Sequence, residues 1–324
     1  KLAQRTSVIG QTSSGNFLNI YNILPHARKY WIASTRMFKI DDDLTNFTED
    51  GLANTPSDGP ITDSCIWRNK MYVSKTNRVS ELDFTLWTAS FSNADFSSVQ
   101  AGYPHPIEPN CTDAELLVGD GPLLKSIDAG GDINTVLTFS PNYRVSWIRR
   151  GISVNYIGLE PNSTGTTGNG ALAIWDGLPT TLGPNFIVPL NFHTILSAVV
   201  DDVGVLNILS SDGSLMKFNG TGFQHVSELP VFRNYNARRS WGSTPISVET
   251  HLETRVRQRG MKVIRGQIHI VVEPTLNMTP NTIPEFPGGI WVYDEKNNAF
   301  YNKYPLSSSS NDFGQLKGLS MNSA

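Results

Sequence analysis

A repeated strand pattern limits what this chain can fold into more than any other feature of its sequence. A short apolar alternation ends in Asp or Asn, a turn follows, and an aromatic residue stands on the returning strand. The six copies are Met37–Asp41, Val79–Asp83, Leu123–Asp128, Leu172–Asp176, Leu215–Asn219 and Ile290–Asp294. The aromatic residues that follow five of them are Phe47, Trp87, Phe186, Phe223 and Phe300. Copies along the whole chain indicate one architecture built from repeated β-hairpins.

The spacing of these copies predicts the architecture. They begin at positions 37, 79, 123, 172, 215 and 290, so neighbours lie 42 to 49 residues apart, except for a last gap of 75 residues. A period of roughly 40–45 residues is typical of a four-stranded propeller blade, whose two apolar faces require stacking against neighbouring blades. We therefore predict an all-β fold, a β-propeller of six or seven four-stranded blades. A β-sandwich or a β-solenoid with similar hairpins is the alternative.

The strands around the copies follow the same pattern. Ile61–Val73 and Ile133–Val145 match one another 72 residues apart, and each predicts a strand, a tight turn and a second strand. Ile195–Phe218 predicts two successive hairpins, with Asp-Gly in the second turn. Ser97–Asn110 is predicted to be a long polar loop. We predict a single propeller domain over residues 1–324, with residues 1–16 and 307–324 as terminal extensions.

Composition agrees with an all-β protein and limits the classes of partner. The 324 residues include 7 Trp, 10 Tyr, 15 Phe, 27 Gly and 19 Pro, which suits many short strands joined by turns. The net charge of −3 does not favour general nucleic-acid binding. The chain has no apolar run of about 18 residues, and Lys1–Arg5 lacks the apolar stretch of a secretory signal. Neither a transmembrane segment nor a signal peptide is visible in the sequence.

The residues that carry catalysis or bind metals form no recognisable motif. Cys65 and Cys111 have no metal-binding spacing, the six His residues are scattered, and no GxSxG elbow surrounds a serine. The acidic pairs Asp201-Asp202 and Asp294-Glu295, like the triplet Asp41-Asp42-Asp43, fall at predicted turns, where Asp bonds the local backbone. Gly165–Gly170 has the composition of a phosphate loop without its Lys, and is predicted to be flexible. We predict no enzyme activity, no cofactor and no metal.

A basic stretch is the strongest charge feature in this slightly acidic chain. It consists of Arg233, Arg238, Arg239, Arg255, Arg257, Arg259, Lys262 and Arg265. If residues 255, 257 and 259 lie on a strand, their side chains point to one face. Arg255, Arg257, Arg259 and Arg265 are therefore candidates for contact with DNA or an acidic partner. The alternative is a solvated outer strand balanced by Glu249 and Glu253.

Two segments resemble the β-propeller proteins of bacteriophage tails. The first is Gly204–Pro230, with the turn Ser211-Asp212-Gly213 and the sequence from Phe218 to Phe223. The second is Gly288–Asp294 together with Tyr304–Ser307. The resemblance implies a virion component of the tail tip or nozzle, without catalysis, assembled as a ring of copies around the path of the DNA.

Two hypotheses about function follow, the first from this resemblance and the second as a rival from another class of propeller. In the first, the chain is a structural protein of the virion tail whose propeller contacts other virion subunits in a homo-oligomeric ring, or a host surface. In the second, it is a carbohydrate-binding or glycoside-hydrolysing propeller that uses exposed Trp and Asp residues near a channel mouth. A pocket that joined two carboxylates to several aromatic side chains would favour the second hypothesis.

Overall fold

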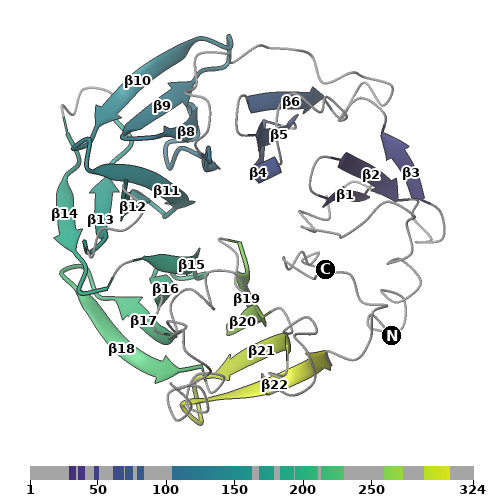
Figure 1. The fold of residues 1–324 in the computed structure, drawn as a ribbon, viewed down its shortest axis with the longest axis vertical. Helices are drawn as coiled ribbons and strands as arrows, with labels where there is room; N and C mark the ends of the chain where they lie inside the picture. Colours follow the sequence, from purple (N-terminus) through teal and green to yellow (C-terminus); the bar gives the residue numbers. More distant parts are fainter. Residues whose placement is uncertain are drawn as a thin grey trace, which may run out of the picture. The chain divides into compact units, whose positions relative to one another are not determined.

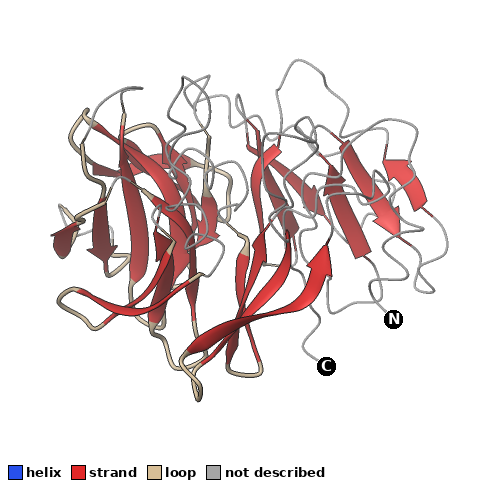
Figure 2. Cartoon of the chain, turned by 60° about the horizontal axis from the view of Figure 1, so that its bottom comes forward, coloured by secondary structure: helices blue, strands red, loops and turns tan. Residues whose placement is uncertain are grey.

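The computed structural model describes a chain of antiparallel sheets. It covers residues 29–33, 36–40, 47–50, 61–68, 70–75, 79–83, 104–162, 168–178, 183–192, 194–210, 213–229, 259–272 and 288–306. These residues contain strands and turns but no helix, which confirms the all-β prediction (Figures 1 and 2). The chain divides into two compact units, Leu24–Thr194 and residues 195–324 with 1–23, which are described separately. That residues 1–324 form a single domain stays a prediction.

The unit Leu24–Thr194 contains four sheets in the part of the chain described. Two have three described strands, in the orders β1-β2-β3 and β4-β5-β6, and two have four, β10-β9-β8-β7 and β11-β12-β13-β14. The first two sheets comprise β1 Lys29–Ala33, β2 Arg36–Ile40, β3 Phe47–Asp50, β4 Ile61–Trp67, β5 Lys70–Lys75 and β6 Val79–Asp83. The other two comprise β7 Ile107–Pro109, β8 Leu116–Asp120, β9 Leu123–Ile127, β10 Ile133–Thr138, β11 Tyr143–Arg150, β12 Asn155–Pro161, β13 Ala171–Trp175 and β14 Phe186–Pro189.

The described residues of the second unit form two four-stranded sheets, each in chain order. Their strands are β15 Ile195–Val200, β16 Leu206–Ser210, β17 Ser214–Phe218, β18 Phe223–Glu228, β19 Met261–Ile264, β20 Gln267–Val272, β21 Gly288–Asp294 and β22 Ala299–Leu306. Every described pairing in both units is antiparallel between strands that are consecutive in the chain. Four-stranded meanders of this kind are the units from which propellers are built. The exact number of blades stays a prediction.

The sequence repeat corresponds to one strand of each sheet. The six copies lie in β2, β6, β9, β13, β17 and β21, and in the four complete sheets the copy is the third strand. The predicted aromatic residue opens the returning strand at Phe47, Phe186 and Phe223, and it is the second residue of β22 at Phe300. In two sheets it faces an aromatic of the repeat, with ring centroids 5.4 Å apart for Phe218 and Phe223, and 5.3 Å for Tyr293 and Phe300. The repeat is therefore confirmed as a structural unit.

Two sequence predictions about this region were wrong. The match between residues 61–73 and 133–145 predicted two equivalent hairpins. Only residues 61–73 form a hairpin, made of β4 and β5. In the second, β10 pairs with β9 and β11 pairs with β12, so the turn at Ser140 joins different sheets. The segment Ser97–Asn110 contains the short strand β7, although three of its last seven residues are prolines. An edge strand tolerates proline because few of its N–H groups are needed.

Apolar clusters lie between neighbouring sheets within each unit. One joins the sheet β4–β6 to β7–β10 and includes Trp67, Tyr72, Ile107 and Val118. The next joins β7–β10 to β11–β14, where alternate residues of β12 and β13 meet Leu117, Leu124 and Leu137. In the second unit, β15–β18 packs on β19–β22 through residues such as Leu209, Ile270 and Trp291. Burial of these side chains is the main favourable term that holds sheet against sheet.

Candidate functional site

The structure describes two of the four arginines predicted to contact DNA or an acidic partner. Arg259 is half-buried in the turn before β19, and Arg265 is exposed in the turn after it, with φ at +51°. They lie at opposite ends of the four-residue strand Met261–Ile264, which spans roughly 13 Å at about 3.3 Å per residue. The structure therefore does not bring these two side chains together. Arg255 and Arg257 lie outside the described residues, and their role stays a prediction.

Asp201 and Asp294, the first residues of the two acidic pairs predicted to serve turns, hold their turns through side-chain hydrogen bonds. The Oδ1 atom of Asp201 accepts hydrogen bonds from the amides of Val203 at 3.1 Å and Val205 at 2.8 Å. The Oδ1 atom of Asp294 accepts one from the amide of Lys296 at 3.0 Å. Equivalent bonds fix the turns that begin at Asp128, Asp176 and Asn219. Asp41-Asp42-Asp43 lies outside the described residues.

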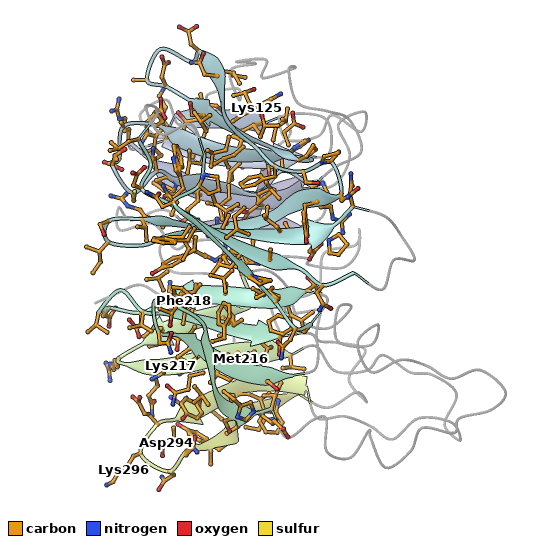
Figure 3. The ribbon with its side chains drawn as sticks, turned by 90° about the vertical axis from the view of Figure 1, so that its left-hand side faces the viewer. Lys125, Met216, Lys217, Phe218, Asp294 and Lys296 are labelled. Atoms are coloured by element: carbon orange, nitrogen blue, oxygen red, sulfur yellow. The ribbon has the colours of Figure 1, made fainter. Side chains whose placement is uncertain are left out.

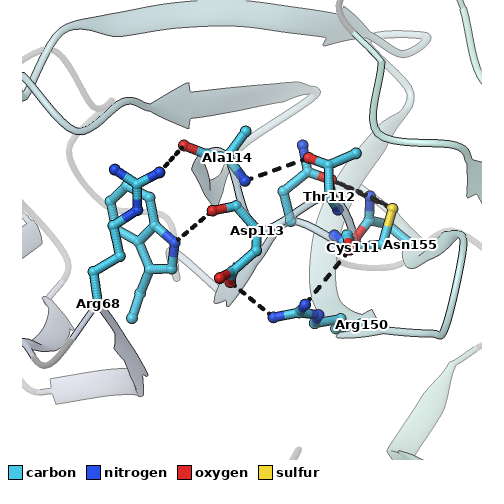
Figure 4. A network of polar contacts seen from close by, with 9 residues as sticks. Arg68, Cys111, Thr112, Asp113, Ala114, Arg150 and Asn155 are labelled. Atoms are coloured by element: carbon cyan, nitrogen blue, oxygen red, sulfur yellow. Dashed lines mark hydrogen bonds and ion pairs between the residues drawn. The ribbon is translucent and has the colours of Figure 1, made fainter.

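A polar network ties together three neighbouring sheets of the first unit (Figure 4). Asn110, next to β7, accepts a hydrogen bond from Nδ2 of Asn155 at 2.9 Å and donates one to the carbonyl of Gly177 at 3.0 Å. The amide of Cys111 donates to Oδ1 of Asn155 at 2.9 Å. Both asparagine side chains are fully buried, so these bonds replace water that folding removed.

The same network continues to the surface and to the sheet β4–β6. Arg150 at the end of β11 donates to Oδ1 of Asp113 at 2.9 Å, and the indole of Trp67 donates to the carbonyl of Asp113 at 3.3 Å. Arg68 lies over the ring of Trp67, with its guanidinium carbon 4.7 Å from the ring centroid. Arg68 also donates to the carbonyl of Ala114 at 3.5 Å, so both arginines make contacts between neighbouring sheets.

Cys111 is held inside this network as a hydrogen-bonding group. Its thiol lies 3.2 Å from the carbonyl of Asp176 and 3.3 Å from Nδ2 of Asn155. Burial raises the pKa of the Cys111 thiol above its usual value, and hydrogen bonds from Thr112 and Asn155 only partly oppose this. Because the thiolate is the reactive form, a raised pKa favours a structural role.

A buried ion pair lies in the sheet β7–β10. Nζ of Lys125, labelled in Figure 3, is 2.6 Å from Oδ2 of Asp120, and the carboxylate is fully buried. His105, also fully buried, has Nδ1 3.0 Å from the carbonyl of Gly119 and 3.8 Å from Asp120. Sequence reasoning missed these residues and the Asn110 network, since no local motif marks them. In the second unit, an ion pair of 2.6 Å at the surface links Lys217, labelled in Figure 3, to Glu295.

Neither a metal cluster nor a membrane-spanning helix is found in the part of the chain described. No group of three or more His, Cys, Asp or Glu side chains there could hold a metal ion. No helix among the same residues is long and apolar enough to cross a membrane. The four Trp side chains whose burial is described, Trp67, Trp147, Trp175 and Trp291, are all buried.

Comparison with known proteins shows likeness in fold alone. No protein-family model matches this sequence, and no curated protein matches it. A chain of a mitotic checkpoint complex is similar with a TM-score of 0.55 and 12% identity, over 92% of this chain and 78% of that one. The extracellular domain of a hybrid two-component system from B. thetaiotaomicron gives a TM-score of 0.52 and 14% identity over 81% of this chain. The present chain spans only 33% of that protein.

Proposed function

We propose that this chain is a structural virion protein of a bacteriophage tail, a propeller subunit that contacts other subunits or a host surface. The observation that carries the proposal is the set of large apolar side chains that the described surface exposes. These are Ile152, Leu178, Phe186, Ile187, Val203 and Tyr301. When exposed apolar side chains gather in a patch, they mark sites of contact with other proteins. The resemblance of residues 204–230 and 288–307 to tail propellers supplies the virion context.

The polar groups support the same proposal. Asp128, Asp176, Asp201 and Asp294 fix turns, Asp120 pairs with Lys125 inside its sheet, and Asp113 pairs with Arg150 of the neighbouring sheet at the surface. A structural subunit needs its polar groups for this purpose, because each sheet must be held in register against its neighbour. The carbohydrate hypothesis would need exposed Trp side chains for stacking, and the four described ones are buried.

The composition of the native particle tests the proposal. We expect mass spectrometry of purified virions to detect this protein at a fixed copy number, and cryo-electron microscopy to locate its sheets in the tail. Its absence from purified virions would refute the virion role. A glycan array and a hydrolysis assay on the purified chain test the rival hypothesis. Specific glycan binding or turnover would replace the structural proposal with a carbohydrate-active one.

A further inference from the structure

The outer strand β14 differs in composition from the outer strands of the other complete sheets. Its sequence Phe-Ile-Val-Pro contains no polar residue, whereas β10, β18 and β22 each carry Asn, Gln, His, Lys, Ser, Thr or Glu. Phe186 is 67% exposed and Ile187 is 56% exposed. Edge strands normally carry charges or other features that prevent pairing with another chain. An apolar, exposed edge strand is therefore an attractive site for association.

The exposed apolar side chains concentrate around this strand. Of the six large ones on the described surface, four belong to the sheet β11–β14, namely Ile152, Leu178, Phe186 and Ile187. The register places Asn155 opposite Trp175 and Ile174 opposite Phe186, so the β11–β12 turn, Leu178 and Phe186 lie at the same end of the sheet. Phe186 shares this end of the sheet with Ile152 and Leu178, while Ile187, the next residue along β14, points to the opposite face of the sheet.

The hydrogen-bond pattern shows which backbone groups of β14 face outward. The amide of Leu190 donates to the carbonyl of Gly170 at 3.0 Å, and Val188 and Phe186 follow in the same register opposite Leu172 and Ile174. Because hydrogen-bonded and non-hydrogen-bonded pairs alternate, the N–H and C=O of Ile187 point to the open edge. The backbone of Pro189, two residues further along, also faces the open edge, but proline has no N–H group to donate.

We propose that β14 pairs antiparallel with β14 of a second copy of this chain across a two-fold axis, with Phe186 opposite Phe186 of the partner subunit. Ile187 then stands opposite Asn185 of the partner subunit, and each such pair exchanges both of its N–H···O bonds. Pro189 lies outside these pairs, so its missing N–H costs none of these bonds. The arrangement satisfies the open donor and acceptor of Ile187 and covers the exposed ring of Phe186.

A second copy fits this edge for two reasons. The strand carries no charge, so two copies approach without like-charge repulsion, and an isologous interface needs one self-complementary patch. A four-residue edge strand buries less than the roughly 800 Å² per partner of a standard stable interface, so we expect weak, concentration-dependent association. The inference takes from the proposed function only the expectation of self-assembly. If the protein proves absent from virions, the dimer of the purified chain remains measurable.

Sedimentation velocity of the purified full chain over a concentration series, from about 1 to 200 µM, tests the association. We expect the dimer fraction to rise with concentration, and Ile187→Lys to abolish it by placing a charge on each side of the axis. Val203→Lys is the matched control, since Val203 is 76% exposed in the other unit, and it should leave the dimer unchanged. Circular dichroism checks that both variants fold. A wild-type monomer at every concentration, or equal loss in both variants, overturns the proposal.

A disulfide tests the strand register. In a non-hydrogen-bonded antiparallel pair the Cα atoms are about 4.5 Å apart, which a disulfide bridges. Phe186→Cys should therefore give a covalent dimer under mild oxidation, seen on a non-reducing gel. The control is Gln224→Cys on the exposed outer strand β18, which should give no more dimer than the wild-type chain with its two native cysteines. A dimer that Phe186→Cys fails to crosslink would place the interface elsewhere and overturn the proposal.

Discussion

The carbonyl of Gly177 accepts a hydrogen bond from Asn110 in the polar network between sheets. Substitution of Gly177 by alanine therefore tests that network. Gly177 has φ at +79°, and a Cβ atom there would lie 2.1 Å from Oδ1 of Asn110. The same Cβ would lie 2.9 Å from Sγ of Cys111 and 3.0 Å from Nδ2 of Asn155. No real Cβ contact is this short, so the side chain of Asn110 must move in the variant. The hydrogen bonds that Asn110 makes would then be lost.

The expected loss of stability has two parts. A left-handed backbone costs a residue with a Cβ about 1–2 kcal/mol. Moving Asn110 breaks its bonds to Asn155 and to the carbonyl of Gly177, and an unsatisfied buried polar group costs about 1–3 kcal/mol. We therefore expect Gly177→Ala to lower the free energy of unfolding by roughly 2–5 kcal/mol. This is a large share of the 5–15 kcal/mol or so that is typical of a native domain.

Urea denaturation measures this loss, with tryptophan fluorescence as the probe. Trp67, Trp147 and Trp175 are buried in the same unit as Gly177 and report on its unfolding. The matched control is Gly131→Ala, because Gly131 has φ at +90° and no atom within 4 Å of a Cβ. The control should lose only the backbone part, about 1–2 kcal/mol. Equal losses in the two variants would refute the claim that the network stabilises the unit.

Three further predictions, each tested by substitution, concern other parts of the fold. Gly158→Ala places a Cβ 2.2 Å from the indole of Trp147 and should cost roughly 2–4 kcal/mol in urea denaturation, while Gly183→Ala, with no atom within 4 Å, should change little. Asp201→Ala should cost about 1 kcal/mol and Asp201→Asn less than half of that, because Asn keeps the turn acceptor; equal losses would contradict the turn role. Burial lowers the pKa of His269 below its usual 6.5, so the unfolded chain binds a proton that the folded chain does not, and stability should fall as the pH drops below about 6.5. His269→Gln should flatten this slope in urea midpoints measured from about pH 5 to 8, and an unchanged slope would count against the assignment.

The strands could be predicted because their signal is local. Each copy of the repeat combines a strand alternation with an Asp or Asn that bonds the next turn, and both features act within a few residues. Asp201 and Asp294 could be assigned to turns for the same reason. The turn at Ser140 shows the limit of local signals. It has the sequence of a hairpin turn, yet the strands on either side of it pair with other neighbours.

The contacts between sheets could not be predicted, because their partners are distant in the chain. Asn110 meets the carbonyl of Gly177 across 67 positions, and Cys111 meets Asn155 across 44. No spacing rule connects an Asn beside a three-residue strand to a Gly in a turn of the next sheet. The buried pair of Asp120 and Lys125 is closer in sequence, but its burial depends on packing against β4–β6. A local sequence pattern therefore predicts a strand or a turn, but it does not predict which distant residues pack against it.

The aromatic residue of the repeat shows why those surroundings matter for function. Phe300 packs against the apolar cluster of its unit, and Phe223 faces the ring of Phe218. Phe186 occupies the same place in its hairpin but is 67% exposed. The repeat dictates an aromatic at this position, because it stabilises a hairpin across the turn. Among the copies whose aromatic burial is described, only the structure distinguishes Phe186 as the one that lacks cover, and this departure from the repeat is the reason to expect an interaction at β14.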